Sequence, residues 1–269
     1  MRPFHSALIA ACALVAAGCS DNVTDPSALA SPPPSSFFPD HDVLRAALRD
    51  VLDDPNHNGG LGFDMWATIV DRNGDVVDVV FSGEKLGDQW PGSRLLSAQK
   101  ANTGNEFSLE GFALSSANLF APAQPGGSLF GLQESNPVDP AVAYGGKASD
   151  FGTGKDFMIG KRVGGVNVFG GGFGLYTPSG KLVGGIGVSG DTSCTDHIIG
   201  WKLRHALNLD NVPAGVAPCA PNGTDNIIFN DGEAIDGFEH ARCIDLDGQG
   251  LNEPIAEALP DTHPVGPDE

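Results

Sequence analysis

The sequence predicts an α+β domain in which helices pack on one antiparallel sheet. Two pairs of strand-like segments are each joined by a short turn, and such hairpins form antiparallel pairs. Amphipathic segments lie before, between and after these pairs, and no further strand pattern follows the last one. This order argues against a doubly wound parallel sheet, in which a parallel strand lies beyond each helix.

The first helix and the first hairpin are expected in the amino-terminal third of the domain. Over residues 40–54, Val, Leu and Ala recur on one face of a helix, and Asp40 can cap its start. Strands are predicted over 63–70 and 76–81. Asn73-Gly74 lies between them, and this dipeptide is typical of two-residue hairpin turns.

A second helix is predicted over residues 93–106, and a further helical piece over 108–120. Residues 121–162 are rich in Gly, Pro and Asn, and they are expected to form a long irregular insertion. Loop-like segments of this length inside a domain are commonly lids or walls of binding sites.

The second hairpin and the last helix complete the predicted domain. Strand patterns cover residues 165–176 and 181–189, and Thr177 to Gly180 form the turn between them. A helix is expected to start at Asp191 or Thr192 and to continue through His205, because apolar side chains recur on one of its sides.

A G-x-G-x-x-G pattern, formed by Gly185, Gly187 and Gly190, begins within the fourth predicted strand. A dinucleotide-binding turn needs these glycines after the strand and a parallel strand beyond the helix. Here two of the three lie within the predicted strand, so the pattern does not predict a nucleotide site.

Glycines inside strands mark bends or the close approach of another group. The partner strand carries the run 170–172, which includes Gly171, so two neighbouring strands lack side chains near Gly187. One interpretation is a flat slot for a planar ligand beneath the last helix, which we call the glycine slot. The alternative is a bent sheet packed tightly against that helix.

The amino terminus has the features of an export signal. Residues 1–19 contain Arg2 and then a short apolar run, too short for the roughly 20 residues of a membrane span. The ending VAAGC resembles a bacterial lipobox, so Cys19 is the expected lipidation site. The alternative is ordinary signal cleavage with Cys19 incidental.

Composition divides the rest of the chain into three parts. Residues 20–39 are rich in Ser and Pro and are expected to be a disordered linker. The domain itself is assigned to residues 40–215. Residues 216–269 are expected to form an irregular carboxy-terminal extension that frays after about Glu253.

The formal net charge is −19, and no run of Lys or Arg occurs. Nucleic acids and anionic membrane surfaces attract basic proteins, so neither is expected as a direct partner. We expect membrane contact only through the lipid anchor.

Three of the five cysteines remain after Cys12 and Cys19 are set aside, namely Cys194, Cys219 and Cys243. An exported chain favours one disulfide, with three possible pairings. We expect Cys194–Cys243, because it would attach the tail to the domain and stabilise the fold by about 4 kcal/mol through closure of a loop of roughly 49 residues.

Several of these segments together resemble the GlcG/HbpS-like haem-binding family, which is related to the carboxy-terminal domain of PduO-type proteins. The run VGGVNVFGGGFGLYTPSGKLVGGIGVSGDTSCTDHIIGWKLRHAL is similar to the family's second half, and ATIVDRNGDVVDVV to its first hairpin. Lys100, Ala101 and Thr103 match its K-A-x-T-A helix. The resemblance covers about residues 40–210, interrupted by the insertion.

The resemblance implies a PAS- or profilin-like α/β layer, often oligomeric, that binds haem non-covalently. Sensor relatives carry an E-x-x-E iron site before the lysine of the second helix. Leu95 and Ala98 occupy those places here, so that iron site is expected to be absent. Asn167 replaces the proline that usually follows the family's GGV sequence.

The candidate haem contacts combine this resemblance with the residue chemistry. His197, at the start of the last helix, is the candidate iron ligand, because imidazole is a common axial ligand of haem. Arg94, Lys100 and Arg204 are candidates for pairing with propionates. The remaining candidate contacts are Thr103, Gly171 and Gly187.

An enzymatic alternative starts from Ser189, which lies in a G-V-S-G sequence near His197 and Asp191. The G-x-S-x-G spacing and the parallel sheet of a nucleophile elbow are both missing. Asp191 and Asp196 are expected to be helix caps.

The sequence therefore favours an extracytoplasmic, lipid-anchored protein that binds or senses haem, located at the outer membrane or in the periplasm. Homo-oligomerisation is possible. The alternatives are an enzyme that degrades haem or acts on another small molecule in the same pocket, and a structural envelope lipoprotein.

Overall fold

The computed structural model describes residues 37–54, 58–218, 221–229, 237–243 and 252–266. The expected signal segment, Cys19 and Cys219 lie outside the described residues, as does most of the expected linker. Phe38, at the end of that linker, is buried in the main hydrophobic core. Within the described residues, no helix is both long enough and apolar enough to span a bilayer.

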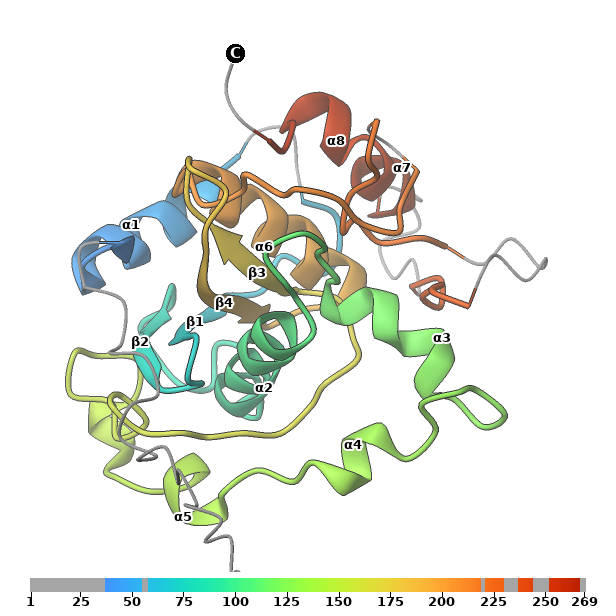
Figure 1. Ribbon diagram of the computed structural model, residues 1–269. Coiled ribbons are helices and arrows are strands. Elements are labelled where there is room, and N and C mark those ends of the chain that lie inside the picture. Colours follow the sequence, from blue (N-terminus) through green and yellow to red (C-terminus); the bar gives the residue numbers. More distant parts are fainter. Residues whose placement is uncertain (1–36, 55–57, 219–220, 230–236, 244–251, 267–269) are drawn as a thin grey trace, which may run out of the picture. The chain divides into compact units, whose positions relative to one another are not determined.

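The centre of the fold is a four-stranded antiparallel sheet in the order β2-β1-β4-β3 (Figure 1). The strands are β1 (Trp66–Asp71), β2 (Val76–Phe81), β3 (Gly172–Tyr176) and β4 (Leu182–Ser189). This arrangement confirms the predicted α+β class. Strand β3 is shorter than predicted, since residues 165–171 do not pair as a strand.

Helices cover both faces of the sheet. Helix α2 (Ser93–Glu106) packs on one face, whereas α1 (His41–Leu52) and α6 (Ser193–Ala206) pack on the other. The alternation of side chains along β1 produces this division. Trp66 and Val70 point towards α2, and Ala67 and Ile69 join the core formed with α1 and α6.

Helix α2 lies unusually close to strands β3 and β4, because glycines face it. Gly172 pairs with Gly187 across the sheet, and Gly174 pairs with Gly185. A Cβ atom on Gly187 would overlap the carbonyl oxygen of Ser97. The expected open glycine slot is therefore wrong, since the backbone of α2 occupies the space above these strands.

The insertion is folded against the domain through short helical turns (Figure 1). They are α3 (Phe120–Ala123), α4 (Leu132–Ser135), α5 (Pro140–Ala143) and η4 (Ala148–Asp150), and the turn η3 (Ser116–Leu119) lies just before the insertion. Ala143 and Met158 are buried in the core beside α2. The helical piece predicted over 108–120 is reduced to the short turn η3.

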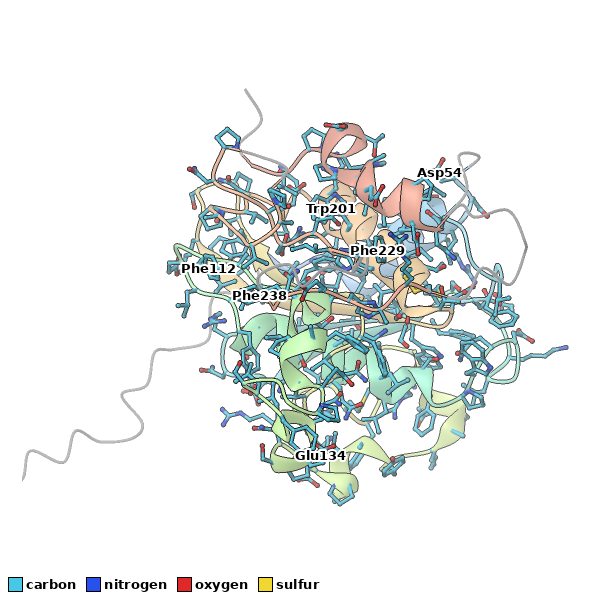
Figure 2. All side chains as sticks on the ribbon, turned by 90° about the vertical axis from the view of Figure 1, so that its right-hand side faces the viewer. Asp54, Phe112, Glu134, Trp201, Phe229 and Phe238 are labelled. Atoms are coloured by element: carbon cyan, nitrogen blue, oxygen red, sulfur yellow. A yellow bond between two sulfur atoms is a disulfide. The ribbon has the colours of Figure 1, made fainter. Side chains whose placement is uncertain are left out.

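The carboxy-terminal segment forms two short helices, α7 (Asn252–Glu257) and α8 (Leu259–Thr262). The expected fraying after Glu253 is therefore wrong for the residues of these helices. Trp201 of α6 lies close to this segment (Figure 2), and its indole N–H donates to the carbonyl oxygen of His263 over 2.9 Å. Leu259 is fully buried.

The predicted disulfide between Cys194 and Cys243 is present. It joins the first turn of α6 to the carboxy-terminal segment and closes a loop with a sequence separation of 49. In the chain-entropy description, a loop of this length stabilises a fold by about 4 kcal/mol.

We expect Gly187→Ala to lower the free energy of unfolding by about 3 kcal/mol, which is the upper part of the usual range for overpacking. The added methyl group would meet backbone atoms of α2, which cannot rotate away. Gly111→Ala is the matched control, because Gly111 is exposed and a Cβ atom added to it would have no neighbour within 4 Å. Urea unfolding of both variants measures the effect, and equal stabilities would contradict the proposed packing role.

Candidate functional site

A cavity of about 380 Å³ lies between the amino-terminal turns of α2 and α6, and we call it the α2–α6 cavity. Its wall comes from three segments that are distant in the sequence, residues 90–100, residue 169 and residues 189–196. The lining residues are Trp90, Gly92, Ser93, Leu96, Lys100, Phe169, Ser189, Asp191, Ser193 and Asp196.

The floor of the cavity contains a buried ion pair. The ammonium nitrogen of Lys100 lies 2.6 Å from Oδ2 of Asp196 and donates to the carbonyl oxygen of Val188 over 3.3 Å. Lys100 and Asp196 are each only 2 % exposed. Ser189 completes the group, with its hydroxyl 3.4 Å from the same carboxylate oxygen.

The second carboxylate oxygen of Asp196 is also satisfied. Oδ1 accepts the backbone N–H groups of Gly190 and Asp191 over 3.0 and 2.9 Å. Burial raises the pKa of the Asp196 carboxyl from 3.8 to about 6, against the attraction of the Lys100 ammonium. A carboxyl with this pKa can exchange a proton with a ligand near neutral pH.

The helix caps differ in part from those expected. Thr192 is the N-cap of α6, and its hydroxyl accepts the N–H of Thr195. Asp191 instead fixes the loop before β1, since its carboxylate accepts the N–H groups of Leu61 and Phe63. Asp196 bonds back to the turn before the helix and carries the ion pair.

The rim of the α2–α6 cavity is apolar and accessible. Trp90 is 51 % exposed, Leu96 36 % and Phe169 45 %. Trp90 is held edge-on by Phe63, with ring centroids 5.3 Å apart. Large exposed apolar side chains grouped around a cavity are typical of a ligand or partner site.

His197, the candidate iron ligand, lies away from this rim. Its ring is fully buried, with Nε2 3.1 Å from both Asn226 Oδ1 and the N–H of Ile227. Burial lowers the pKa of the imidazole well below its ordinary value. His197 could contact a haem only if the segment that covers it moved.

The candidate propionate partners are occupied by carboxylates of the protein itself. Arg94 pairs with Asp156, with Nε 2.8 Å from Oδ2, and Arg204 pairs with Asp225 through two contacts of 2.6 and 2.9 Å. Both arginines are buried. Arg94 lines a smaller neighbouring cavity of about 200 Å³, and Lys100 is the one predicted contact that lines the α2–α6 cavity.

The remaining predicted contacts serve packing in the structure. Thr103 is buried, and its hydroxyl donates to Gln99 and accepts from the N–H of Asn167. Gly171 has a positive φ of 111° and lies against Val188 and Asp196. Gly187 lies beneath α2, and none of these three residues lines the α2–α6 cavity.

Sequence reasoning missed the apolar rim and the role of Asp196. Trp90 and Phe169 lie in segments without regular periodicity, so their convergence has no local signal in the sequence. In the sequence, the signal for the role of Asp196 would have been a Lys on a buried helix together with an Asp close to the end of a strand. The arrangement offers an apolar surface, one near-neutral acid and two hydroxyls, Ser189 and Ser193.

The serine-nucleophile alternative finds no support in this geometry. Ser189 contacts Asp196, and among the described residues no histidine forms a hydrogen bond with its hydroxyl. His197 turns its ring towards Asn226 and Phe173 instead.

The comparisons with known proteins identify relatives of most of the domain. Residues 42–202 match the sequence pattern of a family described as haem-degrading protein HbpS-like. No curated protein matches the chain.

Three solved structures are similar to the chain at low identity. They are the Klebsiella pneumoniae protein ORFY (20 % identity, covering 61 % of this chain and 84 % of that one, TM-score 0.40), a PduOC:haem complex (22 %, 64 % and 96 %, 0.43), and a double mutant of Streptomyces reticuli HbpS (18 %, 73 % and 97 %, 0.37).

The raised pKa of Asp196 has a consequence for stability. A carboxyl with a higher pKa in the folded than in the unfolded protein stabilises the fold fully below about pH 3.8, and this contribution is lost as the pH rises through about 6. Between pH 4.5 and 7 we expect the wild type to lose about 2 kcal/mol relative to the Lys100→Met/Asp196→Asn double variant. Urea unfolding at both pH values measures this difference, and parallel pH profiles would contradict it.

Proposed function

The chain belongs to the HbpS-like family of haem-degrading proteins, and on that premise we propose that it binds haem non-covalently at the rim of the α2–α6 cavity. The observation that carries the location is the exposed apolar group of Trp90, Leu96 and Phe169. A porphyrin is a flat apolar body, so it gains most from burial against such side chains.

The residues of the rim are suited to contact with the porphyrin ring, but they are poorly suited to strong coordination of the iron. Trp90, Leu96 and Phe169 can cover one face of the ring. Apart from the Lys100 nitrogen, which is paired with Asp196, the described lining offers oxygen donors to the iron, among them the hydroxyls of Ser189 and Ser193. Because Lys100 is paired with Asp196, propionates would extend towards solvent.

A second candidate function is haem degradation, which the family's description and the floor of the cavity favour. Asp196 has a pKa of about 6 and lies beside the Lys100 ammonium, so the pair can supply a proton near neutral pH. In this function the same rim would hold haem as the substrate.

Hemin titration of the purified chain tests the proposed site. We expect a Soret band on addition of hemin, and Leu96→Ala should raise the Kd about tenfold, because the loss of apolar contact costs about 1.4 kcal/mol. Leu109→Ala is the matched control, since Leu109 is 62 % exposed and follows the opposite end of α2. Absence of the band would refute haem binding, and equal Kd values for the two variants would refute the location.

The two candidate functions differ in the fate of bound haem. Incubation of the complex with oxygen and a reductant should leave the Soret band stable if the chain only binds or senses haem. Loss of the band with stoichiometric release of iron would establish degradation. Asp196→Asn should then slow the loss, since the proton donor is removed.

We also propose that the chain is exported and held to a membrane by a lipid on Cys19. A disulfide between Cys194 and Cys243 is typical of an oxidising compartment, which supports export. Cys19→Ser should move the protein from the membrane fraction to the soluble fraction of the producing cell. An unchanged distribution would refute lipidation at this residue.

Homo-oligomerisation stays a prediction.

A further inference from the structure

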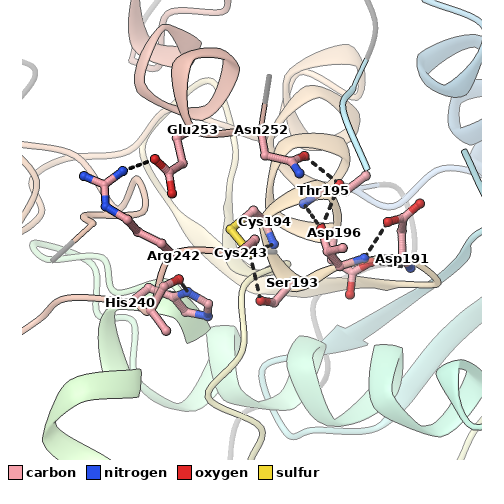
Figure 3. Close-up of a disulfide and its surroundings, with 12 residues drawn as sticks. Asp191, Ser193, Cys194, Thr195, Asp196, His240, Arg242, Cys243, Asn252 and Glu253 are labelled. Carbon is pink, nitrogen blue, oxygen red and sulfur yellow. Dashed lines mark hydrogen bonds and ion pairs between the residues drawn. A yellow bond between two sulfur atoms is a disulfide. The ribbon is translucent and has the colours of Figure 1, made fainter. Parts of the chain in front are cut away.

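We propose that reduction of the Cys194–Cys243 disulfide creates a zinc site in which the two thiolates and the imidazole of His240 bind one Zn²⁺ ion. One ligand atom from each of the three residues lies within 4.8 Å of the other two (Figure 3). Two sulfurs and one imidazole nitrogen are a ligand set that zinc prefers. The site adjoins the proposed haem site, since Ser193 lines the α2–α6 cavity and its hydroxyl lies 3.4 Å from the sulfur of Cys243, but the three proposed ligands are not part of that lining.

The hydrogen bonds of His240 leave one ring nitrogen available. Nδ1 lies 2.7 Å from the carbonyl oxygen of Ala241, which can only accept, so Nδ1 carries the hydrogen. Nε2 is buried and has no hydrogen-bond partner among the described residues. A lone pair without a partner, on a ring whose other nitrogen donates to a carbonyl, is the usual arrangement of a zinc-binding histidine.

The position of His240 is fixed by its backbone and by its ring. Its N–H donates to the carbonyl oxygen of Ile228 over 2.7 Å. The ring packs against Phe120, with centroids 4.8 Å apart. The residue is 2 % exposed, so the imidazole is preorganised beside the sulfurs.

The surroundings of the sulfurs stabilise thiolates. Cys194 occupies the first turn of α6, where the helix dipole favours negative charge. Its backbone N–H donates to the sulfur of Cys243 over 3.0 Å, and the hydroxyl of Ser193 lies 3.4 Å from the same sulfur. These groups lower the cost of a thiolate after reduction.

The reaction balances with an external dithiol as the reductant. The dithiol passes two electrons and two protons to the disulfide, which becomes two thiols, while the dithiol becomes a disulfide. Zn²⁺ then displaces the two thiol protons and forms two Zn–S bonds of about 2.3 Å and one Zn–N bond of about 2.0 Å. Two thiolates neutralise the ion, which suits a buried position, and water or Ser193 can fill the fourth place.

Cobalt binding to the purified chain tests the proposal, because Co²⁺ replaces Zn²⁺ in thiolate sites and gives a thiolate-to-metal absorption band. We expect one Co²⁺ per chain after reduction by a phosphine that does not itself bind metal. The oxidised chain should give no band, and Zn²⁺ should displace the cobalt. A reduced chain that gives no such band overturns the proposal, whether or not it remains folded.

Variants identify the ligands. His240→Ala should weaken cobalt binding by at least about tenfold, and Cys243→Ser should abolish the thiolate band. His205→Ala and Cys219→Ser are the controls, because His205 lies at the opposite end of α6 and Cys219 is not one of the three proposed ligands. Unchanged affinity in His240→Ala, or loss of the band in Cys219→Ser, would assign the metal to other residues and overturn the proposal.

Discussion

The close contact between helix α2 and the glycines of strands β3 and β4 is the constraint on which the rest of the domain depends. With no Cβ atoms at Gly185 and Gly187, the backbone of α2 rests directly on the sheet. Because α2 lies this close to the sheet, Lys100 reaches the carbonyl oxygen of Val188 and the carboxylate of Asp196 at the start of α6. The same contact fills the space above these strands, so a planar ligand cannot lie directly on their glycines.

Buried cations connect the added segments to the core helices. Arg94 of α2 pairs with Asp156 of the insertion, and Arg204 of α6 pairs with Asp225 near the carboxy terminus. An unpaired buried guanidinium would be strongly destabilising, so each pair requires its distant segment to be in place. The insertion and the extension are therefore structural parts of the domain, although neither has a strong periodic pattern in the sequence.

The sequence was sufficient for the elements with strong local signals. Strand β2 and helix α2 occupy the predicted residues, and the Cys194–Cys243 pairing was also predicted correctly. The function of the glycines could not be predicted, because a strand without side chains accommodates a helix and a ligand equally well. The burial of His197 was equally hidden, since Asn226 and the residues after it cover the ring from outside the predicted domain.

The cover over α6 has a consequence for how the chain can be divided. The described residues after 221 supply the countercharge of Arg204, the cap over His197 and the acceptor for the Trp201 indole. A fragment cut at the end of the family match, residue 202, would lose Arg204 itself together with the cap over His197 and the acceptor for the Trp201 indole. The smallest part of the chain that folds on its own therefore extends past residue 202, where the family match ends. Recombination that moves this domain into another gene would also have to include the residues after 221.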